Sequence, residues 1–356
     1  GWTMYASEAI KPLVKIPVIN SHTLRDPDYC ERVLAEGKTD MVGLSRQILA
    51  DPYWAAKAYL GKPEKIRKCI SCLTGCWQES LMAKKEIACA VNPACGDLRF
   101  ADMRRTSNPL RVAIVGGGPA GLEAARIATV RGHKPTVFEK TGELGGAILG
   151  CCMVPDKDKM KWYADWLRNE IRDLGVEVQL CHAPTIEELT GYDVVLNATG
   201  AHSYVPPVHG QADRVIPFED VIACPKVKCE WYPQGSNRKA RRVGERVLVW
   251  GDHYAAADTV AYLAAIGKDV TVVTEKKEFG STVEVIHMYV LRKRFQQTDA
   301  EALHSKPYKY PVKVIQNSTL YEIGEGKVVI QDRDFNRQTL EVDDIVTCHT
   351  RPDVAL

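Results

Sequence analysis

The sequence predicts an α/β fold built on parallel sheets, and three observations predict it. Strands and helices alternate over the first 65 residues, a strand–glycine turn–helix–strand pattern occupies residues 111–139, and a similar pattern follows within residues 246–348. The 47 Lys and Arg residues nearly balance the 45 Asp and Glu residues, which gives no reason to expect a nucleic-acid partner. No apolar run is long enough to span a membrane, and the N-terminus lacks the features of a signal peptide. We therefore expect a cytoplasmic protein with no membrane partner.

The first segment predicts a βαβα unit. Residues 16–19 form a β-branched run typical of a buried parallel strand, and residues 40–44 form the next strand. Helical spacing marks residues 27–36 and 51–60. A complete (β/α)8 barrel needs roughly 250 residues, far more than precede the cysteine-rich segment that follows. We therefore expect the chain to be a piece of a longer protein.

Four of the twelve cysteines lie within 21 residues, at Cys69, Cys72, Cys76 and Cys89. In a chain without a secretion signal, this spacing favours metal ligation over disulfide bonds. Four thiolates at such spacing suit a [4Fe–4S] cluster or a structural zinc ion. Zinc sites tend to use two CxxC pairs, whereas this segment has one CxxC followed by CxxxC, which favours the cluster. Cys95 is a second candidate for the fourth ligand.

Residues 111–139 form the strongest motif in the chain. A strand runs into a G-x-G-x-x-G sequence, and a helix and a second strand follow. Gly116 permits the tight turn, Gly118 lets a pyrophosphate approach the backbone, and Gly121 lets the helix pack closely on the strand. The helix N-terminus offers free N–H groups and a positive dipole to phosphate. Glu139 ends the second strand, where its carboxylate can accept hydrogen bonds from ribose. The motif predicts a bound dinucleotide.

Further candidate contacts to this dinucleotide lie outside the glycine motif. Residues 143–146 contain a second glycine pair, and residues 193–200 read as a strand that ends on small residues. Together with positions beside the motif, the additional candidates are Ala120, Lys140, Gly145, Gly146, Ala198, Thr199 and Gly200.

The second Rossmann-like pattern has lost most of its glycine motif. Only Gly251 remains, because Asp252 and His253 follow it. The His253 side chain stands where a pyrophosphate must approach the backbone, and Asp252 adds a negative charge beside an anionic ligand. Thr274 or Glu275 could still contact a ribose. We therefore expect weak or absent NAD(P)H binding.

The chain resembles a known family of multi-cofactor flavoproteins, related to 2,4-dienoyl-CoA reductase, enoate reductase and trimethylamine dehydrogenase. The resemblance rests on six motifs in the same order: SRQILADP (45–52), CISCLTGC (69–76), CAVNP (89–93), VAIVGGGPAG (112–121), ELGG (143–146) and NATG (197–200). Members of this family combine an Old Yellow Enzyme-like barrel that holds FMN, a [4Fe–4S] cluster, and an FAD- or ADP-binding domain with a nested NAD(P)H-type domain.

The resemblance also implies roles for individual residues. The cysteine that precedes xVNP is the fourth cluster ligand, which selects Cys89 over Cys95. Arg46 matches the family's ligand to the FMN phosphate, and the fork of a guanidinium suits that contact. His22 and Thr23 stand where the family has a glycine-containing phosphate turn, so this chain departs from the pattern there.

With this resemblance, the predicted fold is the C-terminal remnant of a (β/α)8 barrel, a cysteine segment and two Rossmann-like units. The predicted domains are the barrel tail at 1–65, the cluster segment and linker at 66–105, the FAD- or ADP-binding unit and connector at 106–242, and a truncated NAD(P)H-type unit at 243–356. We expect residues 201–242 to be irregular. Their basic run is read as a solvated loop rather than a docking patch, and it comprises Arg238, Lys239, Arg241 and Arg242.

The resemblance implies an oxidoreductase that relays electrons between FAD, the cluster and a barrel FMN and reduces an activated C=C bond in a small molecule such as an enoate or enoyl-CoA. The alternative is a tertiary-amine dehydrogenase that passes electrons to an electron-transfer flavoprotein. A third hypothesis is a catalytically silent or zinc-stabilised nucleotide-binding subunit. Catalytic residues would belong to barrel strands outside this sequence, so none is named. We expect a homo-oligomer.

Overall fold

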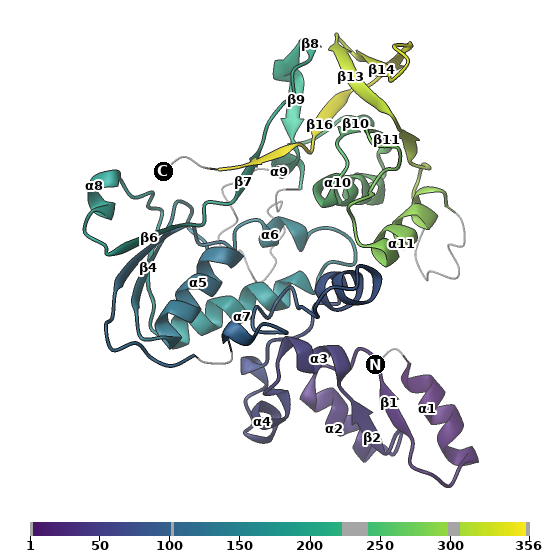
Figure 1. Cartoon of the computed structure of the whole chain (residues 1–356). Coiled ribbons are helices and arrows are strands. Elements are labelled where there is room, and N and C mark those ends of the chain that lie inside the picture. Colours follow the sequence, from purple (N-terminus) through teal and green to yellow (C-terminus); the bar gives the residue numbers. More distant parts are fainter. Residues whose placement is uncertain (1–2, 101–102, 223–240, 298–306, 354–356) are drawn as a thin grey trace. The chain divides into compact units, whose positions relative to one another are not determined.

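The computed structural model describes residues 3–100, 103–222, 241–297 and 307–353. The chain divides into two compact units (Figure 1). Unit 1 contains Gly1–Gly145 and Lys159–Leu196, and unit 2 contains Gly146–Asp158 and Asn197–Leu356. Both units combine parallel sheets with helices, which confirms the predicted α/β fold class. The finer division into four domains stays a prediction.

Unit 1 begins with a two-stranded parallel sheet, β1 (Ile19–Ser21) and β2 (Met41–Gly43). The prediction of a buried strand at residues 16–19 is wrong in both position and burial, because Ile16 and Ile19 are 72% and 60% exposed. Parallel strands are buried when other elements cover both of their faces. Among the described residues, this sheet has only these two strands.

Four helices accompany this small sheet: α1 (Met4–Ile10), α2 (Pro27–Ala35), α3 (Ser45–Ala50) and α4 (Trp54–Tyr59). The predicted helix at 27–36 is confirmed as α2, and the Asp26 side chain caps it by accepting a hydrogen bond from the Tyr29 N–H. The helix predicted to start at residue 51 starts at Trp54 instead. Asp51 has extended backbone angles and accepts a hydrogen bond from the Tyr53 N–H.

The sequence patterns did not predict α3.

The apolar side chains around these helices form one core made of Met4, Leu24, Cys30, Val33, Trp54 and Ile66. A π-helix (Thr74–Met82) follows in the cysteine segment. Short 3-10 turns lie at Lys11–Leu13, Pro63–Lys65, Leu98–Phe100 and Ala212–Arg214.

The remainder of unit 1 is a four-stranded sheet in the order β5–β4–β3–β6. Its strands are β3 (Arg111–Val115), β4 (Lys134–Glu139), β5 (Glu177–Leu180) and β6 (Val194–Asn197). Helix α5 (Pro119–Val130) connects β3 to its parallel neighbour β4 and packs against α7 (Met160–Asp173), and α8 (Ile186–Leu189) precedes β6. The predicted strand–helix–strand unit at 111–139 is confirmed.

Unit 2 is built on a five-stranded parallel sheet in the order β12–β11–β10–β16–β9. The strands are β9 (Val215–Pro217), β10 (Arg246–Trp250), β11 (Asp269–Val273), β12 (Lys313–Ile315) and β16 (Asp344–Thr347). Side chains of β10 alternate between two cores, since Val247 and Val249 belong to one and Leu248 and Trp250 to the other. The sheet is therefore covered on both faces.

One face of this sheet is covered by α10 (Tyr254–Ala265) and α11 (Val285–Phe295). The other face is covered by a smaller sheet in the order β15–β14–β13–β8, visible in yellow and green in Figure 1. Its strands are β8 (His209–Gly210), β13 (Ser318–Ile323), β14 (Lys327–Asp332) and β15 (Arg337–Glu341). The second strand–helix–strand unit predicted from residue 246 onward is confirmed.

The prediction that residues 201–242 are irregular is wrong for residues 201–222. This stretch contains β7 (Ala201–Ser203), which pairs antiparallel with β17 (Thr350–Pro352), as well as β8, β9 and α9 (Phe218–Val221). Short strands of two or three residues carry too little periodicity to be recognised in a sequence. Of the basic run, Arg241 and Arg242 are exposed, whereas Arg238 and Lys239 lie outside the described residues.

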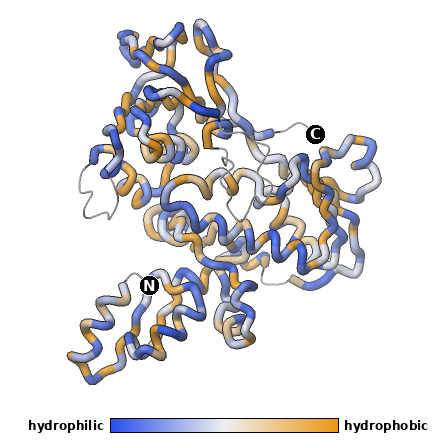
Figure 2. Tube along the Cα trace, turned by 180° about the vertical axis from the view of Figure 1, so that it is seen from behind, coloured by the Kyte–Doolittle hydropathy of each residue, from blue (hydrophilic) through white to orange (hydrophobic). Residues whose placement is uncertain are grey.

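In the part of the chain that the structure describes, no helix is long and apolar enough to cross a membrane. Figure 2 shows hydrophobic stretches interrupted by hydrophilic residues throughout the trace.

A buried ion pair fixes the segment 146–158, which contains α6 (Ile148–Cys151), to the rest of unit 2. The Lys157 ammonium donates to both oxygens of Asp258 on α10, at 2.6 and 2.8 Å. The two side chains are only 11% and 8% exposed. Burial raises the pKa of Asp258, while Lys157 acts in the opposite direction. The positive charge and hydrogen bonds of Lys157 therefore stabilise the ionised form of the buried Asp258 carboxylate.

We predict that Lys157→Met lowers the free energy of unfolding by about 3–5 kcal/mol, because it leaves the Asp258 carboxylate buried without a counter-charge. Urea unfolding followed by circular dichroism measures this loss. The double variant Lys157→Met/Asp258→Asn is the control, and it should recover part of the loss because no buried charge remains. Equal stability of Lys157→Met and the wild-type protein would contradict the prediction.

Candidate functional site

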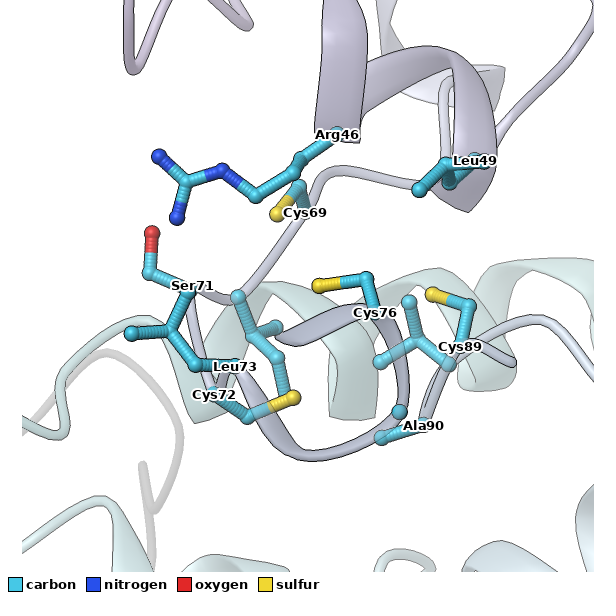
Figure 3. A pocket seen from close by; sticks show the side chains of 12 residues that line it. Arg46, Leu49, Cys69, Ser71, Cys72, Leu73, Cys76, Cys89 and Ala90 are labelled. Atoms are coloured by element: carbon cyan, nitrogen blue, oxygen red, sulfur yellow. The ribbon is translucent and has the colours of Figure 1, made fainter. Parts of the chain in front are cut away.

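The four clustered cysteines line one cavity in unit 1 (Figure 3). Cys69 and Cys72 lie on the loop before the π-helix, Cys76 lies within this helix, and Cys89 forms a single β-bridge with Asn92. Figure 3 shows the sulfur atoms arranged around this cavity. Cys95 does not line it, so the geometry supports the ligand set that includes Cys89.

The cysteine loop has a tightly curled backbone. Ser71 and Leu73 both adopt left-handed conformations, with φ of 58° and 59°, which non-glycine residues rarely adopt. Gly75 faces the segment that carries Cys89, since a Cβ at this position would lie 2.4 Å from the Ala88 carbonyl oxygen. Only glycine allows these two segments to approach so closely. The curl and the close approach bring the cysteines together.

A buried hydrogen-bond network holds the ends of this loop. The Gln47 side chain forms two hydrogen bonds with the backbone of residues 67–69. Its Nε2 donates to the Arg67 carbonyl and its Oε1 accepts the Cys69 N–H, both at 3.0 Å. Arg67 donates to Asn92 Oδ1 at 2.8 Å and to the Ala50 carbonyl at 2.9 Å. Asn92 in turn donates from its backbone N–H to the Cys89 carbonyl at 3.1 Å. The network thus connects the segments that carry the first and fourth cysteines.

The sequence analysis gave no role to Gln47, Arg67 or Asn92. Gln47 and Asn92 belong to the SRQILADP and CAVNP motifs, so their place in motifs that flank the cysteines was the available signal. Arg67 carried no comparable signal. All three side chains are buried, and they form hydrogen bonds with one another or with neighbouring backbone groups. Among the described residues, Arg67 Nη1 makes no hydrogen bond, and it lies 3.9 Å from a Glu123 carboxylate oxygen.

The cavity favours protonated thiols when it holds no metal. Burial raises the pKa of Cys89 to about 11. Burial also raises the pKa of Cys76, and the neighbouring Cys72 and Cys69 add to this effect while Arg46 opposes it. A metal or cluster bound here must displace these protons. Among the described residues, no three His, Cys, Asp or Glu side chains form a group that could hold a single metal ion.

Arg46, the residue predicted to bind the FMN phosphate, projects from α3 and lines the same cavity (Figure 3). Within the described chain it has no hydrogen-bond or ion-pair partner, so its guanidinium is available to an anion. His22 and Thr23 adopt φ of 96° and 58°. Although neither residue is glycine, the turn keeps the backbone conformation that glycine favours, and such strain is typical of functional sites.

The surroundings of this turn are positively charged. Burial lowers the pKa of His22, and the charges of Arg46 and Arg25 lower it further. The positive charges of Arg25 and Arg46 near this turn suit the phosphate of a flavin. The departure from the family's glycine pattern at His22 and Thr23 therefore does not remove the backbone shape that a phosphate site needs.

The three glycines of the first motif differ in what surrounds them. Gly116 has φ of 115° and makes the turn after β3. At Gly121, a Cβ would lie 1.9 Å from the Gly116 carbonyl oxygen, so this glycine serves the packing of α5 on β3. At Gly118, a Cβ would meet no protein atom within 4 Å. The space beside Gly118 suits the pyrophosphate that a G-x-G-x-x-G motif binds.

Glu139, the predicted ribose ligand, is buried and supports the glycine turn. One of its oxygens accepts the Gly117 N–H at 2.8 Å, and the other accepts the N–H and hydroxyl of Thr141, each at 2.8 Å. A carboxylate offers about four lone pairs, so one remains for a ribose hydroxyl. Gly145 has φ of 124° and donates to the Gly117 carbonyl at 2.8 Å.

The other candidate contacts are placed as follows. Ala120 in α5 and Lys140 after β4 are exposed in unit 1. The exposed Gly146 begins unit 2 with φ of 55°. Also in unit 2, Ala198 and Thr199 are half-buried, and Gly200 is exposed with φ of 83°.

The turn that carries Thr199 and Gly200 is held by Asp353. The Thr199 hydroxyl lies 2.9 Å from the Asp353 carbonyl oxygen, and the Gly200 carbonyl accepts the Asp353 N–H at 2.9 Å. A Cβ at Gly200 would meet no atom within 4 Å. Like Gly118, this glycine therefore borders open space.

In the second Rossmann-like motif, Asp252 and His253 accept hydrogen bonds from the chain itself. The Asp252 carboxylate accepts the Gly280 N–H at 3.0 Å and the hydroxyls of Thr274 and Ser281 at 3.2 Å. His253 caps α10, because its Nδ1 accepts the Ala255 N–H at 3.2 Å. One donor of the helix N-terminus, where phosphates bind, is therefore already occupied.

We predict that Gly118→Val abolishes retention of the adenine dinucleotide while the fold survives, because the new side chain enters the open space rather than the protein. Flavin released by heat and quantified by chromatography measures retention, and circular dichroism measures folding. Gly191→Ala is the matched control, since its Cβ makes an ordinary 3.5 Å contact with the Glu188 carbonyl oxygen. Full dinucleotide content in folded Gly118→Val would show that the site was assigned wrongly.

We predict that Cys89→Ser loses the iron of anaerobically purified protein, whereas Cys95→Ser retains it, because only Cys89 lines the cavity. The outcome is measured by the iron content per chain and by the absorption of the cluster at roughly 400 nm. The reverse pattern would identify Cys95 as the fourth ligand.

The chain is similar to several known proteins. The family model of the pyridine nucleotide-disulphide oxidoreductases matches residues 110–348. The NADH oxidase of Thermoanaerobacter brockii is 34% identical over 313 residues, which are 86% of this chain and 46% of that protein. The cinnamate reductase of Clostridium sporogenes is 36% identical over 269 residues, which are 75% of this chain and 38% of that protein.

A solved structure of 2-naphthoyl-CoA reductase superimposes with a TM-score of 0.83 at 25% sequence identity, covering 100% of this chain and 50% of that one. The chain thus spans half or less of the length of each of these relatives. The match runs through the cysteine segment and both Rossmann-like units. The chain therefore belongs to the pyridine nucleotide-disulphide oxidoreductases over residues 110–348 and, as a whole, to the flavin- and iron–sulfur-containing oxidoreductases related to enoate reductase and trimethylamine dehydrogenase.

Proposed function

We propose that this flavin oxidoreductase reduces an activated C=C bond in a small molecule such as an enoate or enoyl-CoA. The observation that carries the proposal is the shared cavity, in which four cysteines and the phosphate-binding candidate Arg46 line the same space. An iron–sulfur centre and a flavin phosphate would thereby lie side by side. The cinnamate and 2-naphthoyl-CoA reductases among the relatives support this substrate class.

The residues present fit the cofactors that this function requires. Cys69, Cys72, Cys76 and Cys89 would hold a [4Fe–4S] cluster, which transfers single electrons, whereas flavins also exchange electron pairs. The buried Gln47 and Asn92 side chains hold the backbone on both sides of the cysteines. Arg46, with the backbone turn at His22 and Thr23, would bind the phosphate of FMN.

The first Rossmann-like motif would hold FAD or ADP. The open space at Gly118 accepts the pyrophosphate, and the free N–H groups at the start of α5 bind it. Glu139 has one remaining acceptor position for ribose. We propose FAD, because a second flavin supplies the electron pairs that the reduction of a C=C bond consumes.

A tertiary-amine dehydrogenase that passes electrons to an electron-transfer flavoprotein is the second candidate. It is favoured by the contacts of Asp252 and His253, which fill the second dinucleotide motif from within the chain. A protein that does not use NAD(P)H needs another electron partner.

The cytoplasmic location, the homo-oligomer and the small-molecule substrate stay predictions.

Two anaerobic half-reactions separate these functions. Flavin reduced by light is mixed with cinnamate, and oxidised flavin is mixed with trimethylamine. Reoxidation by cinnamate alone supports the reductase, and bleaching by trimethylamine alone supports the dehydrogenase. A colourless, zinc-containing protein would favour the catalytically silent subunit.

We predict that NADH or NADPH, mixed in excess with the flavin-loaded protein without oxygen, leaves the flavin absorption unbleached over seconds. The reason is that Asp252 and His253 accept hydrogen bonds from the chain at this turn, so one donor of the α10 N-terminus is already occupied. Stopped-flow absorption near 450 nm measures the rate. Rapid bleaching by either nucleotide would contradict this prediction and strengthen the reductase proposal.

A further inference from the structure

Arg25 is a buried cation in the N-terminal part of unit 1. It follows the turn at His22 and Thr23 and is 9% exposed. Its backbone carbonyl accepts the Trp54 Nε1–H at 2.8 Å, which anchors the residue in the core of unit 1. Among the described residues, no carboxylate forms an ion pair with it, and its Nε has no hydrogen-bond partner. A buried charge without a counter-charge is costly, so an anion is expected nearby.

The side chain of Arg25 is directed to the cysteine loop. Its Nη2 donates to the Ser71 hydroxyl, and Ser71 lies between Cys69 and Cys72 on the wall of the cavity. The guanidinium carbon lies 5.6 Å from the centroid of the Trp162 ring, which covers its other side. Arg25 therefore joins the turn near the flavin phosphate site to the loop that would carry the cluster.

Other charges around the loop do not replace this one. Lys68 also lies over the Trp162 ring, but Asp26 neutralises it at 2.9 Å. Arg46 lines the cavity and is assigned to the flavin phosphate, which would neutralise it. Arg25 alone among these three cations has neither a carboxylate partner nor an assigned anion.

We propose that Arg25 is a positioning residue that fixes the cysteine loop through Ser71, and that its charge raises the reduction potential of the cluster bound there. The inference rests on the proposed cluster. Four thiolates give the cluster a net negative charge, and reduction adds one more electron with no bond formed or broken. A nearby fixed cation stabilises the reduced form more than the oxidised form.

The test is a redox titration of the anaerobically purified protein with dithionite and mediators, followed by electron paramagnetic resonance. Arg25→Gln removes the charge but can still donate a hydrogen bond to Ser71, and Arg25→Lys keeps the charge. Arg32→Gln is the matched control, because Arg32 is an exposed arginine of α2 whose guanidinium stacks on Tyr29. Iron content and thermal unfolding are measured for every variant.

We expect Arg25→Gln to lower the equilibrium constant for reduction of the cluster about tenfold. This corresponds to a fall of about 59 mV in the reduction potential of a one-electron couple. Arg25→Lys and Arg32→Gln should stay close to the wild-type potential. Equal potentials for Arg25→Gln and Arg32→Gln would overturn the inference, and so would equal loss of iron from Arg25→Gln and Arg25→Lys. Wild-type protein without iron would instead overturn the proposed cluster, so the two failures are distinguishable.

Discussion

The hydrogen bonds around Arg67 are the constraint on which the candidate site depends. Its guanidinium and backbone join Gln47 and Ala50 of α3 to Asn92, and these two segments lie far apart in the sequence. Gln47 also accepts the Cys69 N–H, and Asn92 also donates to the Cys89 carbonyl. One buried network therefore holds the backbone at both the first and the fourth cysteine. Loss of a single buried partner leaves the others unsatisfied, so the network acts as a unit.

The two Rossmann-like units differ in what surrounds their first turns. In the first, Gly118 borders open space, and the helix N-terminus is unobstructed. In the second, Asp252 and His253 accept the N–H groups of the chain itself. The strands and helix around both turns remain, because the apolar residues on either side of the sheet specify them. The same arrangement of strands and helix thus surrounds two turns of different character, and the proposal of weak NAD(P)H binding rests on the second.

Sequence patterns predicted the parts of the fold with strong local signals. The glycine motif identified β3, α5 and β4, since each residue type there has a separate steric reason. The patterns failed at Ile16 and Ile19, because burial of a strand depends on neighbours that the local sequence does not contain. They also missed Arg25, since a single arginine gains meaning only when folding places it beside Ser71. The cysteine spacing indicated a metal site, but only the structure shows that Cys89 lines the cavity and Cys95 does not.

The account depends most on the identity of the group in the cysteine cavity. Quantification of iron, acid-labile sulfide and zinc in anaerobically purified protein tests this most directly. The account predicts about four iron and four sulfide per chain and no zinc, as a [4Fe–4S] cluster requires. One zinc per chain without iron or sulfide would contradict it.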